Sequence, residues 1–177
     1  MKNTLIFIVA MIFAGGSGFA VHTYINKQKM QNNPAIGLQR IEFAAADLNG
    51  DIRNIKEWDG KIIFLNFWAT WCPPCKKEIP AFIELQKAYG EQGFQIISVA
   101  IDNEDDVRDY AEMMGMNYPI FATSSEGPML AKRYGNGVGV LPYTVIINRD
   151  SEISNTFLGE LSKKRAKELL EERGIKL

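Results

Sequence analysis

Two cysteines are the residues of this chain most suited to chemistry, and both stand in the stretch WCPPC. Pro73 and Pro74 separate Cys72 from Cys75, and Trp71 precedes the pair. A disulfide between them closes a very small loop and stabilises a fold little, because that stabilisation grows with the length of the closed loop. We therefore predict a redox-active Cys72–Cys75 disulfide that needs no further cofactor.

The residues around the pair predict a strand before it and a helix after it. The apolar run at 61–69 is typical of a strand buried on both faces. Apolar residues then recur at helical spacing up to Gly90, namely Ile79, Phe82, Ile83, Leu85 and Tyr89. Pro73 and Pro74 suit the first turn of such a helix, where their missing N–H groups cost nothing.

Cys72 is then expected at the N-terminus of the helix, with Cys75 one turn further in. Free N–H groups and the positive end of the helix dipole favour a thiolate there and lower the pKa of Cys72. The thiolate is the nucleophile of disulfide exchange, so Cys72 is predicted to attack a partner disulfide. Cys75, expected to be more buried, would resolve the mixed disulfide.

Three neighbouring residues are further candidates for the site. Glu78 follows Cys75 by three residues on the same helix face, and it is either a proton acceptor for Cys75 or an ordinary exposed glutamate. Trp71 either meets the partner or packs into the core. Pro142 precedes a predicted strand and is a candidate cis proline, although position alone does not decide this.

The sequence contains few residues that could bind a metal ion. Structural zinc takes four ligands, and the predicted domain has two cysteines and no histidine, because His22 lies in the N-terminal extension. Copper delivery would also need a supporting histidine. The acidic cluster at 102–106 has Val107 where a calcium loop requires glycine, so Asp102 and Asn103 are instead expected to cap a helix.

The composition of the chain indicates one globular domain with an N-terminal extension. The 177 residues are 46% hydrophobic and 23% charged, and the net charge is −1. So small a net charge provides no field that would attract nucleic acid.

The extension predicts a membrane anchor. Residues 3–26 contain no Lys, Arg, Asp or Glu, and roughly 20 apolar residues suffice to cross a bilayer. We favour residues 1–25 as a single-pass anchor in the cell membrane with the domain outside the cytoplasm, on the periplasmic side, and residues 26–35 as a linker. Small residues within 14–16 and 18–20 offer cleavage sites, and cleavage would leave a secreted soluble form.

Residues 36–177 predict an α/β domain. Two short strands flank the turn at Asn49-Gly50, strands and helices then alternate, and two strands and a helix close the chain. Alternating βαβ units imply parallel strands, and the final strand pair implies an antiparallel edge, so we expect a mixed central sheet with helices on both faces. The expected strands are 61–69, 94–101, 118–122, 143–148 and 152–158; the expected helices are 73–90, 104–115, 125–135 and 163–173, the last capped by Ser162.

The stretch FWATWCPPCKKEIP resembles the thioredoxin superfamily, and it is most similar to the TlpA/ResA-like branch of membrane-anchored thiol–disulfide oxidoreductases. The similarity covers residues 36–173. It implies a thioredoxin-like fold with an N-terminal β-hairpin and a central βα insertion at 94–122. It also implies Cys72 as nucleophile and Cys75 as resolving cysteine.

The resemblance assigns further residues. Pro142 matches the cis proline beside the cysteines, and Trp71, Leu141 and Pro142 would form the surface on which a partner docks. Glu78 matches the acidic residue of the CKKE pattern in this branch. Cytosolic thioredoxins usually bury an Asp where this chain has Asn66, and because Asn cannot take up a proton, Glu78 is the expected proton carrier.

For function, the resemblance implies a tethered oxidoreductase that mainly reduces disulfides of extracytoplasmic proteins, with electrons from a membrane thiol donor of the DsbD/CcdA type. Cytochrome c maturation is one such task, but members of that group often carry an acidic residue where this chain has Tyr143. A disulfide donor or isomerase is the alternative within this chemistry, and a redox-inactive tethered binding module is the alternative outside it. A peroxiredoxin is disfavoured, because its motif requires Pro and Thr at Leu65 and Ala69.

Overall fold

The structure is a computed structural model that describes residues 33–176, and the chain from Pro34 onward forms one compact unit. The predicted anchor at 1–25 lies outside the described residues, as does most of the predicted linker at 26–35. Among the helices of residues 33–176, none is long and apolar enough to cross a membrane.

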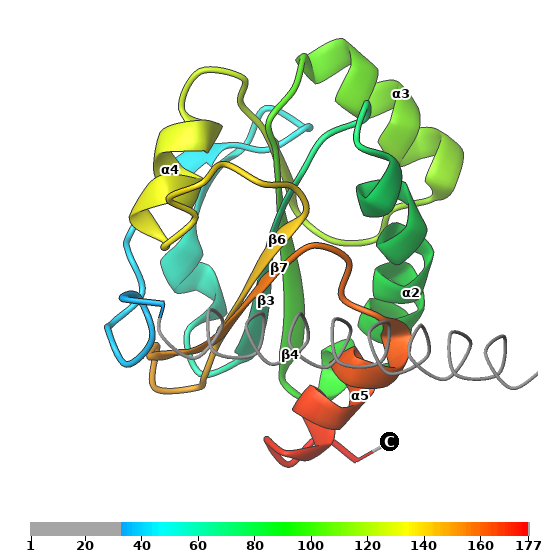
Figure 1. Cartoon of the computed structure of the whole chain (residues 1–177). Helices are drawn as coiled ribbons and strands as arrows, with labels where there is room; N and C mark the ends of the chain where they lie inside the picture. Colours follow the sequence, from blue (N-terminus) through cyan, green and yellow to red (C-terminus); the bar gives the residue numbers. More distant parts are fainter. Residues whose placement is uncertain (1–32, 177) are drawn as a thin grey trace, which may run out of the picture. The chain divides into compact units, whose positions relative to one another are not determined.

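A five-stranded mixed sheet forms the centre of the fold, in the order β5-β4-β3-β6-β7 (Figure 1). Its strands are β3 (Ile62–Trp68), β4 (Phe94–Ala100), β5 (Ile120–Ala122), β6 (Tyr143–Ile147) and β7 (Ile153–Leu158). β4 runs parallel to β3 and β5, whereas β6 runs antiparallel to β3 and β7. The predicted mixed sheet with an antiparallel edge is confirmed.

The central strands β3 and β4 are buried along their whole length, which explains the unbroken apolar runs in the sequence. Asn66 is the polar residue of β3, and it pairs with Ser98 of β4 and with Thr144 of β6. Residues paired in this way point to the same face of the sheet. A short polar row therefore crosses an otherwise apolar sheet.

Residues 33–176 contain four α-helices: α2 (Pro73–Tyr89), α3 (Glu104–Met114) and α4 (Gly127–Arg133) lie between strands, and α5 (Lys163–Glu171) follows the last strand. Figure 1 shows α2, α3 and α5 on one side of the sheet and α4 on the other. The predicted central βα insertion at 94–122 corresponds to β4, α3 and β5, which precede α4 in the chain. The expectation of helices on both faces is confirmed.

The N-terminal part of the domain is a separate two-stranded sheet, as the turn at Asn49-Gly50 predicted. β1 (Ala44–Ala46) and β2 (Ile52–Asn54) pair in antiparallel fashion, and a short 3₁₀ helix, η1 (Ile55–Trp58), follows directly. A second 3₁₀ helix, η2 (Gly90–Gln92), extends α2.

The end of the last helix differs from the prediction. Ser162 caps α5, as expected, but the helix ends at Glu171 and not at Arg173. The N–H of Gly174 donates to the C=O of Glu171, and Gly174 has a φ of +80°, a backbone conformation that glycine adopts without steric cost. The chain therefore leaves the helix through a turn two residues before the predicted end.

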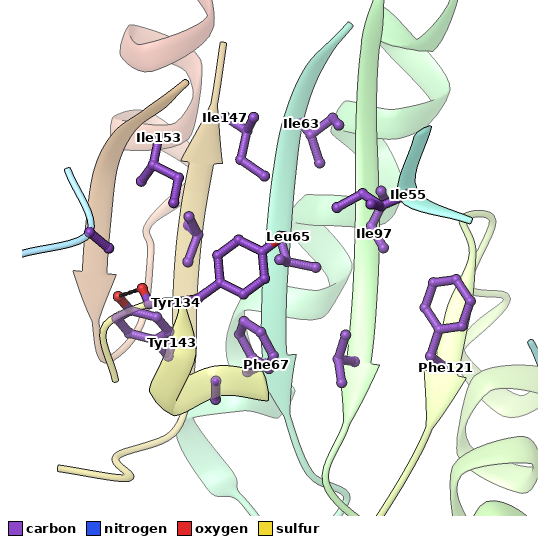
Figure 2. Packing of buried hydrophobic residues seen from close by; sticks show 14 of the residues in the cluster. Ile55, Ile63, Leu65, Phe67, Ile97, Phe121, Tyr134, Tyr143, Ile147 and Ile153 are labelled. Atoms are coloured by element: carbon purple, nitrogen blue, oxygen red, sulfur yellow. Dashed lines mark hydrogen bonds between the residues drawn. The ribbon is translucent and has the colours of Figure 1, made fainter. Parts of the chain in front are cut away.

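An apolar cluster fills the space between the sheet, η1 and α4 (Figure 2). β3 contributes Ile63, Leu65 and Phe67, which share one face because alternate residues of a strand point to the same side. The opposite face of β3 carries Asn66, which bonds to α2. The polar row thus lies beneath the helix that carries the cysteines.

Candidate redox site

The two cysteines form a disulfide at the N-terminal end of α2, with an S–S distance of 2.09 Å. Cys72 is the N-cap residue of this helix, and Pro73 and Pro74 form its start, as predicted. Cys75 is fully buried, whereas Cys72 keeps 4% of its surface exposed. The expected arrangement of an outer and an inner cysteine is confirmed, while their roles as nucleophile and resolving cysteine stay predictions.

Pro142 lies at the start of β6, and its peptide bond with Leu141 is cis, as predicted. Tyr143 pairs with Phe67, so the start of β6 lies beside the end of β3. The chain reaches Cys72 four residues after β3 ends. The cis proline and the disulfide, which are far apart in the sequence, therefore belong to the same end of the sheet.

The three predicted docking residues differ in exposure. Trp71 keeps 65% of its surface exposed, so the hypothesis that it packs into the core is wrong. Leu141 is half-buried and Pro142 is buried. Trp71 is thus a large aromatic side chain on the surface next to Cys72, where a partner can contact it.

Glu78 is buried in the α2 face that packs on the sheet, with 2% of its surface exposed. The hypothesis of an ordinary exposed glutamate is therefore wrong. Its Oε1 accepts a hydrogen bond from Asn66 Nδ2 at 2.8 Å, and its Oε2 accepts one from the N–H of Leu161, also at 2.8 Å. Asn66 Nδ2 donates as well to Thr144 Oγ1 at 3.0 Å, so the polar row fixes the carboxyl group in place.

Burial is the main reason why the pKa of Glu78 is raised to about 8, since an apolar environment disfavours the charged carboxylate. The hydrogen bonds from Leu161 and Asn66 lower the pKa and offset part of this effect, and the nearby charge of Glu160 raises it. A carboxyl group that titrates close to neutral pH can both accept and release a proton under working conditions. Glu78 follows Cys75 by three residues in α2, the spacing from which the sequence predicted a proton acceptor for the Cys75 thiol, and this role stays a prediction.

Asp102 has a place in the site that the sequence did not indicate. It was expected to cap α3 together with Asn103, but the structure shows that Asn103 alone does so, by accepting a hydrogen bond from the N–H of Asp105. Asp102 Oδ2 instead accepts hydrogen bonds from Thr70 N at 2.9 Å and Thr70 Oγ1 at 2.5 Å. The carboxylate after β4 thereby holds the loop after β3, two residues before Cys72.

The pKa of Asp102 lies below its usual value. Partial burial raises it, but the hydrogen bonds from Thr70 and from the N–H of Asn103 together outweigh that effect. Asp102 is thus ionised at neutral pH and able to hold the loop. The signal that could have found it is its position directly after a buried strand parallel to β3.

Tyr143, the residue after the cis proline, faces the interior. Its side chain is fully buried, and its hydroxyl donates a hydrogen bond of 2.8 Å to the C=O of Tyr134 (Figure 2). This position therefore presents no side chain to a partner. In the described part of the chain, no cluster of three or more His, Cys, Asp or Glu side chains is placed to hold a metal ion.

The fold and the site together define a class. A mixed sheet of this topology, a CxxC disulfide at the start of a helix and a cis proline at the same end of the sheet are the features of a thioredoxin-like thiol–disulfide oxidoreductase. Residues 36–156 match the model of the AhpC/TSA family. The chain belongs to this family within the thioredoxin superfamily and, by the relatives described next, to its ResA-like thiol–disulfide oxidoreductases.

Known proteins similar to this chain carry the same description. The thiol-disulfide oxidoreductase ResA of Bacillus thuringiensis (strain Al Hakam) is 35% identical over 169 residues, which cover 93% of each chain. The protein of the same description from Halalkalibacterium halodurans is 35% identical over 136 residues, which cover 76% of this chain and 75% of the relative.

Solved structures agree on the fold. A thiol:disulfide interchange protein of the thioredoxin family from Chlorobium tepidum superposes with a TM-score of 0.72 at 26% identity, covering 78% of this chain and 97% of that one. A secreted thiol-disulfide isomerase from Corynebacterium glutamicum has a TM-score of 0.66 at 20% identity, covering 76% and 83% of the two chains, a likeness that concerns the fold alone.

Proposed function

We propose that this oxidoreductase works as a reductant of disulfides in extracytoplasmic proteins. The observation that carries the proposal is the buried carboxyl group of Glu78, one helical turn after Cys75 and held by Asn66 and Leu161. Two consequences follow from this placement, one for the proton that the reaction must move and one for the reduction potential.

The first consequence concerns the proton of Cys75. The Cys72 thiolate attacks a partner disulfide, forms a bond to one partner sulfur and releases the other as a thiolate. Cys75 then gives its proton to the Glu78 carboxylate, and its sulfur attacks Cys72. The Cys72–Cys75 disulfide forms, the second partner thiolate leaves, and two electrons have passed to the partner.

The second consequence concerns the potential. A thioredoxin-like protein becomes a strong oxidant when its surroundings stabilise the reduced, thiolate form. Here the residues between the cysteines are two prolines without charge, and the buried ionisable group one turn after Cys75 is the carboxyl of Glu78, which is neutral below its pKa of about 8 and so gives a thiolate no positive partner. The dithiol form therefore gains little stability, which favours a low potential and the reducing direction.

The proposal includes the cellular setting. The uncharged segment at 3–26 supports a membrane tether, with the domain outside the cytoplasm. In that setting the disulfide must be reduced again by an electron donor, and a membrane thiol protein of the DsbD/CcdA type suits this role. A cytochrome c apoprotein, whose haem-binding cysteines must be reduced, is a suitable first substrate to test.

A measured reduction potential tests the direction. The protein is equilibrated with dithiothreitol or glutathione buffers, and the fraction of oxidised pair is read from thiol alkylation. We expect a value near that of thioredoxin, about −270 mV, whereas a value near about −120 mV would make the protein a disulfide donor and overturn the proposal.

Trapping tests the substrate class. A full-length Cys75→Ala variant should hold partner proteins on Cys72 as mixed disulfides that mass spectrometry identifies, and Cys72→Ala serves as the matched control. Capture of extracytoplasmic proteins with paired cysteines is the expected result. If Cys72→Ser leaves cellular activity unchanged, the protein is a binding module and not a reductant.

A further inference from the structure

The segment between α4 and β6 contains an apolar surface loop that takes no part in the thiol chemistry. The loop consists of residues 137–141 and ends at the cis bond to Pro142. Val138 keeps 73% of its surface exposed and Val140 keeps 45%. Burial of apolar surface therefore does not explain these two valines, which lie within the loop that leads to the cis proline.

Asn136 ties this loop together from the protein interior. Its side chain is 3% exposed, and it makes two hydrogen bonds to the backbone of one residue. Nδ2 donates to the C=O of Val140 at 2.9 Å, and Oδ1 accepts from the N–H of Val140 at 3.2 Å. The side-chain amide thus pairs with Val140 as the backbone of a neighbouring strand would, because it offers one donor and one acceptor side by side.

The base of the loop is fixed on both sides. The N–H of Asn136 donates to the C=O of Ala131 in α4 at 2.9 Å, and the Tyr143 hydroxyl bonds to Tyr134 across the base. Within the described residues, by contrast, the N–H and C=O of Leu141 make no hydrogen bond. The loop is therefore rigidly held, and its free backbone groups are at the residue next to the cis proline.

We propose that Asn136 is a positioning residue for substrate binding, an inference that rests on the function proposed above. By occupying both backbone groups of Val140, it leaves Leu141 as the residue that pairs with an extended segment of the protein substrate. The same bonds hold the backbone of Val140, and the exposed side chains of Val140 and of nearby Val138 contact apolar residues that flank the cysteine of the substrate.

The physical consequence is control of register. Strand pairing that slips by one residue turns every side chain to the opposite face. If the backbone of Val140 were free, a substrate segment could pair with either Val140 or Leu141. The substrate cysteine would reach Cys72 in only one of these two registers. By pairing with Val140, Asn136 excludes the unproductive register.

Kinetics with two probes test the role. Reduction of insulin disulfides reports on protein binding, whereas reduction of dithiobis(nitrobenzoate), a small disulfide, reports on the thiol chemistry. For Asn136→Ala we expect the KM for insulin to rise about fivefold to tenfold, the effect of about one lost hydrogen bond per binding event, with kcat and the rate on the small disulfide unchanged. Val138→Ser should also raise the KM for insulin.

Two controls separate the outcomes. Asn117→Ala removes another asparagine that donates to a backbone C=O, and Met113→Ser removes another exposed apolar side chain; neither should change the KM. An unchanged KM in Asn136→Ala, or an equal loss of reduction rate with both probes, would overturn the role of Asn136 but leave the proposed function standing. A wild-type protein that reduces neither probe would overturn the proposed function and this inference with it.

Hydrogen exchange tests the inference without substituting Asn136. In the wild-type protein, the amide of Val140 should exchange slowly and that of Leu141 rapidly. When a cysteine-containing peptide of insulin is trapped on Cys72 of Cys75→Ala, the Leu141 amide should become protected. Rapid exchange at Val140, or no protection at Leu141 after trapping, would contradict the role of Asn136.

Discussion

Asn66, on the central strand β3, donates a hydrogen bond of 2.8 Å to the carboxyl group of Glu78 on α2. The bond joins the middle of the buried sheet to the helix that begins at the redox disulfide. Because the donors of Asn66 and Leu161 are fixed, the proton affinity of Glu78 is set by a rigid environment and not by solvent.

The pH dependence of disulfide exchange should depend on Glu78. As a proton acceptor it acts when ionised, so the rate should rise with pH around its pKa of about 8. Glu78→Gln should remove this inflection and slow exchange at pH 8 by about tenfold to a hundredfold. Stopped-flow measurements across a pH series give the profile, and Glu84→Gln, an exposed glutamate of the same helix, is the control. A profile that survives in Glu78→Gln would remove this residue from the mechanism.

The stability of the oxidised protein should fall as the pH rises. Burial raises the pKa of Glu78 from an ordinary value of 4.5 to about 8, so in this window the folded chain binds more protons than the unfolded chain. The free energy of unfolding therefore decreases from about pH 4.5 upward until the group is ionised in both states, by at most on the order of 5 kcal/mol. Denaturant titrations across this range measure the effect. In Glu78→Gln, the free energy of unfolding should change less with pH than in the wild type. Parallel curves for the two proteins would contradict the raised pKa of Glu78.

Asn66→Asp should raise the pKa of the site further. It places a second carboxyl group at hydrogen-bond distance from Glu78, and two such groups share one proton before both ionise. The exchange rate should then rise only above pH 8, and the stability at alkaline pH should drop below that of the wild type. Thr144→Val is the control, because it removes a partner of Asn66 without adding a charge. An unshifted carboxyl titration by NMR would show that the two groups do not interact.

Asp102→Ala should loosen the loop before Cys72. It removes the ionised oxygen that accepts both hydrogen bonds from Thr70, which we expect to cost about 1–3 kcal/mol of stability. Since the pKa of Asp102 is lowered in the folded protein, this stabilisation is present above its unfolded pKa and is lost as the pH falls through the folded value. Thermal unfolding of Asp102→Ala and of Asp109→Ala, an exposed aspartate of α3, makes the comparison. Equal melting temperatures would refute the role.

The local features of the site were predictable because they depend on neighbours in the chain. The apolar run of β3, the two prolines and the helical spacing after them place Cys72 at a helix N-terminus without reference to the rest of the fold. The end of α5 at Glu171 was less predictable, because the turn at Gly174 competes with a continued helix at little difference in free energy.

The sequence by itself determined the CxxC pair, its place at a strand-to-helix junction and the alternation of strands and helices, since short-range periodicity and turn chemistry encode all three. Only the tertiary structure decided that Glu78 is buried against Asn66, that Trp71 is exposed, that Asp102 holds Thr70, and that Asn136 pairs with Val140. Three of these facts depend on which element covers which face, and the fourth on how a loop folds back on its own base. Burial and hydrogen-bond partners are properties of packing between segments, and packing sets the proton affinity of a carboxyl group far more strongly than its neighbours in the chain do.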